Sequence, residues 1–99
     1  MLQLYRISTN VEETEYALEY VMTKNSGTYE WEQNEEYGVI CTLFGQEGQL
    51  RDREEIKRVT PDCGKMEEIL KCLVKNQVFP VHVKEIVSDL LEMQLERSA

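Results

Sequence analysis

The chain has 99 residues, of which 41% are hydrophobic. This length predicts one domain over residues 1–99, and the composition excludes an intrinsically disordered chain. The net charge of −8 argues against DNA or RNA as a partner, because affinity for nucleic acid comes largely from neutralising phosphates.

Charge and cysteine content also indicate in which cellular compartment the protein is found. Residues 1–50 hold nine acidic and two basic side chains, so this half would be repelled by anionic lipid. No apolar run approaches the ~20 residues that span a bilayer, and the N-terminus lacks the regions of a signal peptide. The three cysteines show no CxxC or CxH spacing, which argues against structural zinc, and unpaired thiols suit a reducing compartment. We therefore expect a cytoplasmic protein with no cofactor and no membrane partner.

The first sixty residues are predicted to form strands, because apolar and polar residues alternate along them. The segment GQEG, 45–48, is typical of a hairpin turn, and the N-terminal LQLYRI is a further candidate strand. Apolar residues from Tyr29 to Leu43 keep one phase of alternation, so one long strand over 28–44 stays open as an alternative. The strands that the pattern predicts are 15–24, 29–32, 37–44 and 49–59, with a turn over 33–36.

Residues 61–97 are predicted to form a helical hairpin, since apolar residues recur at every third or fourth position. Thr60-Pro61-Asp62 is typical of a helix start with Thr60 as the capping residue, and Asn76 or Gln77 ends this helix. Pro80 opens the second helix. The two apolar stripes are Met66, Ile69, Leu70, Leu73 and Val74, and then Val83, Ile86, Val87, Leu90 and Leu91.

These elements predict an α+β protein. An antiparallel β-meander of about four strands, within residues 1–60, is followed by a two-helix hairpin packed on one face of the sheet. The strand 37–44 is apolar on both faces, with Tyr37, Val39, Cys41 and Leu43 on one and Ile40 and Phe44 on the other, and the helices leave one side of the sheet uncovered. That side needs cover from curling of the sheet, from the N-terminal strand folding over it, or from another chain, so homodimerisation is one of the possibilities left open.

Three stretches of the chain resemble a known family. The YG at Tyr37, the passage IKRVTPD into the first helix and the segment PVHVKEIVSDLL are similar to a small family of uncharacterised bacterial proteins of about this length. The resemblance covers roughly Tyr37 to Leu91 and implies no activity and no functional residues. It implies a complete small protein rather than a fragment of an enzyme.

His82 is the only histidine and lies where the second helix is expected to begin. On a helical wheel, Glu85 and Asp89 fall on the same side of the helix as His82. Such a group could supply two or three ligands to a divalent metal or form a proton relay. Because a catalytic metal site usually needs three protein ligands, we interpret His82 as a half-packed boundary residue and predict no metal site and no catalytic residue.

Cys63 is the second candidate for chemistry, because a helix N-terminus lowers the pKa of a thiol and His82 could complete a Cys–His pair. Its position on the helical wheel lies on the apolar arc of the first helix. We therefore interpret Cys63 as a small buried residue, assign Cys41 to the core, and expect Cys72 to be exposed.

The stretch TYEWEQNEEYG, 28–38, is the best surface candidate. Tyrosine and tryptophan are favoured anchors at protein interfaces, and surrounding acids could steer a basic partner. The alternative is a strand whose aromatic side chains face the core. The predicted interaction surface consists of Tyr29, Trp31, Glu32, Glu35 and Tyr37.

The sequence therefore favours a small non-enzymatic protein that acts as an interaction or regulatory module and binds another protein or a second copy of itself. Two alternatives stay open. One is a small enzyme or a metal- or ligand-binding domain centred on His82. The other is an acidic inhibitor of a nucleic-acid-binding protein.

Overall fold

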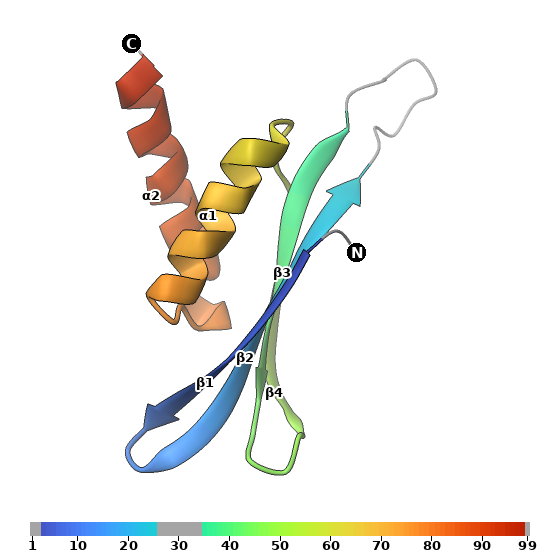
Figure 1. The fold of residues 1–99 in the computed structure, drawn as a ribbon, viewed down its shortest axis with the longest axis vertical. Helices are drawn as coiled ribbons and strands as arrows, with labels where there is room; N and C mark the ends of the chain where they lie inside the picture. The colour runs from blue at the N-terminus through green and yellow to red at the C-terminus, as the bar shows by residue number, and fades with distance from the viewer. Residues whose placement is uncertain (1–2, 26–34, 99) are drawn as a thin grey trace.

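The computed structural model describes residues 3–25 and 35–98, with side chains up to Met93. Within these residues, four strands form one antiparallel sheet in the order β1-β2-β3-β4, and two helices follow (Figure 1). The predicted α+β fold, a meander and then a helical pair, is confirmed. The elements are β1 (Gln3–Val11), β2 (Thr14–Asn25), β3 (Glu36–Phe44), β4 (Leu50–Thr60), α1 (Cys63–Lys75) and α2 (Pro80–Ser98).

The candidate strand LQLYRI is β1, which forms one edge of the sheet. β2 and β3 are direct neighbours, with Asn25 opposite Glu36 at one end of their ladder. Glu36, placed in a turn by the sequence pattern, is therefore the first residue of β3, because it pairs with β2. The predicted strand 29–32 lies outside the described residues, and the choice between one strand and two over 28–44 rests on the same segment.

A two-residue turn joins β1 to β2. Val11 pairs with Thr14 across it, and φ angles of 50° at Glu12 and 67° at Glu13 place both residues in the left-handed region. This is the geometry of a type I′ hairpin turn, which matches the twist of the flanking strands and usually takes Asn-Gly. Two glutamates are unusual at these positions, so the residue types alone do not indicate this turn.

The helix α1 begins later than predicted. Asp62 is its N-cap, with an extended backbone and a carboxylate that accepts a hydrogen bond from the Lys65 N–H at 3.2 Å. Thr60, the predicted cap, still belongs to β4 and pairs with β3, and its hydroxyl accepts a hydrogen bond from the Asp62 N–H. The predicted end of α1 is confirmed with Asn76 as the C-cap, and α2 begins at Pro80 as expected.

The core lies between the helices and one face of the sheet (Figure 1). Tyr20, on β2, is fully buried, and its hydroxyl donates a hydrogen bond to the Val78 carbonyl at 2.7 Å, in the connection between α1 and α2. The Cys41 thiol points to the same carbonyl, with its Sγ at 3.7 Å. The buried hydrophobic side chains are Leu18, Tyr20, Met22, Val39, Cys41, Met66, Ile69, Leu70, Leu73, Val78, Val83 and Val87.

Candidate interaction surface

The surface predicted from the acidic–aromatic stretch is only partly described. Tyr29, Trp31 and Glu32 lie outside the described residues. Glu35 is exposed, and its carboxylate contacts the Lys24 ammonium at 2.8 Å, which holds the pKa of Lys24 above its ordinary value. Tyr37 is half-buried and packs against the core, so its ring is partly withdrawn from solvent.

His82 lies in the first turn of α2, where its backbone N–H donates a hydrogen bond to the Phe79 carbonyl. Its side chain is exposed rather than half-packed, because Val83 takes the buried position in this turn. Glu85 and Asp89 are exposed as well. In the described part of the chain, no group of three or more His, Cys, Asp or Glu side chains is placed to hold a metal ion.

The three cysteines are free thiols in three different environments. The prediction that Cys63 is buried is wrong, because α1 begins at this residue and the buried stripe of the helix starts one turn later, at Met66. Cys72, predicted to be exposed, is half-buried. Cys41 is in the core as predicted, and burial raises the pKa of its thiol to about 12.

The face of the sheet opposite the helices carries three rows of side chains that run across all four strands, and we call it the open face. Cross-strand partners in an antiparallel sheet point to the same side, so the pairing defines each row. A charged row lies between two rows that contain most of the apolar residues of this face. The rows are Leu4–Val21–Ile40–Glu55, Arg6–Glu19–Thr42–Arg53 and Ser8–Ala17–Phe44–Leu50.

The large apolar side chains of the open face are incompletely covered. Leu4 and Leu50 are 46% and 61% exposed, and Val21, Ile40 and Phe44 are half-buried. None of the five belongs to the core or packs against it. β3 is therefore apolar on both faces, as predicted, with helices on only one of them. The N-terminal strand, as β1, extends the open face and does not fold over it.

The charged side chains of the three rows pair with one another. Arg6 lies 3.8 Å from Glu19 and 5.4 Å from the centroid of the Phe44 ring, and Arg53 reaches Glu55 at 3.4 Å. Exposed pairs of this kind contribute only about 0–1 kcal/mol to stability. Their main consequence is a nearly neutral surface on a chain whose net charge is −8.

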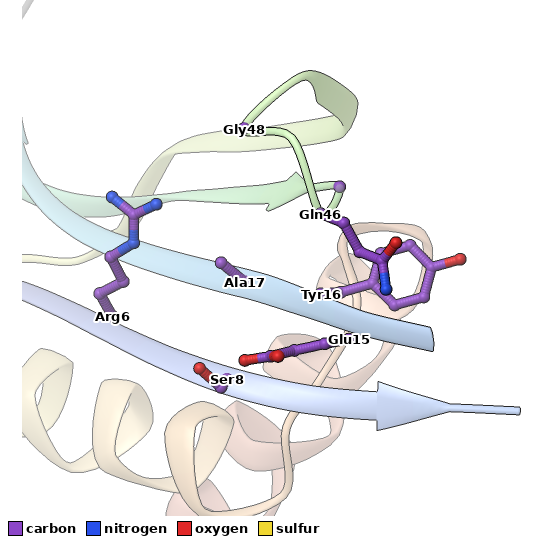
Figure 2. Close-up of a pocket in the computed structure, with 8 residues that line it drawn as sticks. Arg6, Ser8, Glu15, Tyr16, Ala17, Gln46 and Gly48 are labelled. Atoms are coloured by element: carbon purple, nitrogen blue, oxygen red, sulfur yellow. The ribbon is translucent and has the colours of Figure 1, made fainter. Parts of the chain in front are cut away.

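One end of the open face is hollowed. Figure 2 shows Arg6 and Ser8 on one side, the turn residues Gln46 and Gly48 on the other, and Ala17 between them. The hollow has a volume of about 360 Å³. It combines small residues with hydroxyl, amide and charged groups. Its lining residues are Arg6, Ser8, Glu15, Tyr16, Ala17, Gly45, Gln46 and Gly48.

The fold and this surface define the class: a small α+β protein whose helices cover one face of a four-stranded antiparallel sheet. The chain matches the model of DUF6514, a family of unknown function, over residues 2–93 and belongs to that family. This confirms the resemblance to an uncharacterised family and extends it from Tyr37–Leu91 to β1 and β2. No curated protein and no solved structure matches the chain. Neither helix, over its described residues, combines the length and apolarity needed to cross a membrane.

Proposed function

We propose that the protein is a non-enzymatic interaction module that binds another protein through the open face. The observation that carries this proposal is the set of large apolar side chains that lie outside the core, on a face that no described element covers. Removing such area from water favours association by roughly 25 cal/mol per Å². Contiguous exposed apolar surface with polar groups around it is typical of protein interaction sites.

The chemistry of the open face favours a protein partner over a nucleic acid. Phosphate binding relies on basic groups that can neutralise the backbone, whereas Arg6 and Arg53 each lie beside a carboxylate. The apolar rows offer area, and the hollow beside Ala17 offers a place for one anchoring side chain. The proposal includes a cytoplasmic location, which three free thiols support.

Affinity capture from an extract of the source cells tests the proposal. The double variant Leu4→Lys/Leu50→Lys places charges on both apolar rows, at their two most exposed positions. Val81→Lys is the matched control, because Val81 is an apolar residue of α2 that is 71% exposed and far from the open face in the fold. We expect proteins that the wild-type chain and Val81→Lys retain, and that the double variant loses.

The outcome is read on variants whose thermal unfolding shows that they are folded. A wild-type chain that retains no specific protein contradicts the proposal. So does a double variant that retains the same proteins as the wild-type chain. Loss of capture in Val81→Lys as well would move the binding surface from the open face to the helices.

A further inference from the structure

The two edge strands of the sheet, β1 and β4, differ in how their edges are protected. Charged side chains and bulges on an edge strand hinder pairing with another strand. β4 has both devices, since its ladder with β3 is interrupted by two register shifts and seven of its 11 residues are charged. These charged residues are Arg51, Asp52, Arg53, Glu54, Glu55, Lys57 and Arg58.

β1 has neither device. Its ladder with β2 is unbroken from Gln3 to Val11, and Arg6 is the one charged residue among the nine of the strand. The pair Val11–Thr14 flanks a two-residue turn and is therefore a hydrogen-bonded pair. Because such pairs alternate along an antiparallel ladder, every second residue from Val11 back to Gln3 also forms its backbone hydrogen bonds with β2. The residues between them direct their N–H and C=O groups away from β2. These are Leu4, Arg6, Ser8 and Asn10.

From this contrast we infer that β1 pairs antiparallel with β1 of a second copy of the chain, which joins two sheets into one. This goes beyond the proposed function, because it names a different surface, the β1 edge, and a different partner. Opposed residues must lie on the same face of the joined sheet, so only a few registers are available. A register centred on Arg6 would oppose two arginines, and it is disfavoured.

The register centred on Ile7 pairs all nine residues of the strand. It opposes Arg6 to Ser8 of the second copy, without contact between like charges. On the helix side it opposes Ile7 to itself and Tyr5 to Thr9, and aromatic and β-branched pairs of this kind stabilise antiparallel strands. Every outward N–H and C=O group of β1 then gains a partner. In the joined sheet, the two open faces form one continuous surface.

Two charge variants of Ser8 test this register by sedimentation of the purified chain up to millimolar concentration. Ser8 is exposed, so both variants are expected to fold. Ser8→Lys places a lysine opposite Arg6 of the second copy, and the symmetry of the dimer creates this repulsive pair twice. Ser8→Glu places a carboxylate opposite the same arginine and creates two attractive pairs. We expect the dissociation constant of the dimer to rise in Ser8→Lys and to fall in Ser8→Glu, each by roughly two- to thirtyfold.

The net charge of the chain distinguishes direct pairing of Ser8 with Arg6 from a long-range effect of charge. Two copies with a charge of −8 repel each other, so an added lysine at an arbitrary position favours association and an added glutamate opposes it. The predicted effects at Ser8 have the opposite signs. Ser88, an exposed residue of α2, provides the control, and Ser88→Lys and Ser88→Glu measure the long-range effect alone.

Disulfide formation gives a second readout. In a background of Cys63→Ser and Cys72→Ser, we expect Ile7→Cys to cross-link two copies under oxidised glutathione, because opposed residues of a non-hydrogen-bonded pair suit a disulfide. Ser8→Cys, which faces Arg6, should cross-link far less. A chain that sediments as a monomer at every concentration overturns the inference, as do Ser8→Lys and Ser8→Glu effects of the same sign. Neither outcome touches the open-face proposal, whose readout is capture of a different protein.

Discussion

The covered face and the open face of the sheet are built by the same four strands, yet their side chains meet different surroundings. Val39 and Ile40 are neighbours on β3, and Val39 is fully buried under the helices while Ile40 is half-buried and lies outside the core. Period-two alternation places successive residues on opposite faces, so one strand contributes to two surfaces. The covered face explains why the chain folds. The apolar residues of the open face keep more contact with water, so we expect them to contribute less to folding.

The largest difference between the faces is expected when the same side chain is truncated on each. Leu18 on the covered face is fully buried, whereas Leu4 on the open face is 46% exposed. Leu18→Ala removes contacts and leaves a cavity, so it should lower the free energy of unfolding by about 2–5 kcal/mol. Leu4→Ala should lower it by about 0.5 kcal/mol or less. Urea denaturation measures both, and equal losses would contradict an uncovered open face.

A smaller loss is expected at Gly38, the one glycine within the strands that the structure describes. Gly38 lies in β3 at a register shift, where a Cβ atom would collide with the backbone carbonyls of Ile56 and Lys57 on β4. Gly38→Ala should lower the free energy of unfolding by about 1–3 kcal/mol, because the strands must move apart. Substitution at Gly38 would then cost nearly as much stability as substitution on the covered face, although Gly38 belongs to neither the core nor the apolar rows.

Gly48 provides the control for this steric effect. Its φ of 81° is unfavourable for alanine, but no atom lies within 4 Å of an added Cβ. Gly48→Ala should therefore lower the free energy of unfolding by about 1 kcal/mol, which is the cost of the left-handed backbone conformation alone. Losses of the same size at both glycines would mean that close contact between β3 and β4 is not what requires Gly38.

The helices were the most predictable part of the molecule, because an apolar stripe fixes which residues are buried without knowledge of any other element. The buried stripe of α1, the cap at Asn76 and the start of α2 at Pro80 follow from spacing alone. The strand pattern likewise identified β3 as apolar on both faces, with Ile40 and Phe44 on the same one, although it did not indicate which face the helices cover. It could not identify the Glu12-Glu13 turn, because the left-handed geometry there comes from strand pairing and not from turn residues.

The candidate surface was less predictable for a related reason. Alternation in a single strand shows which side a residue lies on, but the rows of the open face exist only once the register of all four strands is known. Leu4, Arg6 and Ser8 do alternate with Tyr5 and Ile7, and that pattern was the available signal for β1. The exposure of Cys63 depends on where α1 begins, which Asp62 determines through a cap that competes with Thr60.

An intermediate effect is expected at Tyr20, which is fully buried on the covered face. Tyr20→Phe removes the hydrogen bond to Val78 and should lower the free energy of unfolding by about 1 kcal/mol at neutral pH. Burial, with a smaller contribution from Cys41, raises the pKa of Tyr20, and burial raises the pKa of Cys41 from 9.0 to about 12. The folded chain therefore keeps these groups neutral at a pH where the unfolded chain has released their protons.

The sign of the pH dependence follows. Stability from both groups is fully present below about pH 9 and is lost as the pH rises toward about 12. The free energy of unfolding of the wild-type chain should thus fall over this range, and that of Tyr20→Phe should fall less. Tyr16→Phe, which removes the hydroxyl of a half-buried tyrosine, is measured alongside as the control. Parallel slopes in all three chains would exclude Tyr20 as a source of alkaline unfolding.

The smallest effect is expected at the turn where β1 and β2 meet, and it is a gain. Glu12 and Glu13 have left-handed backbones, which costs a residue with a side chain roughly 1 kcal/mol, whereas asparagine and glycine adopt them readily. Glu12→Asn/Glu13→Gly should raise the free energy of unfolding by about 0.5–1 kcal/mol. Glu12→Gln/Glu13→Gln removes the same two charges and keeps the strained backbone, so it separates the two causes. If the glutamine variant gains as much as the Asn-Gly variant, repulsion among the acids near Glu15, and not backbone strain, limits the stability of this hairpin.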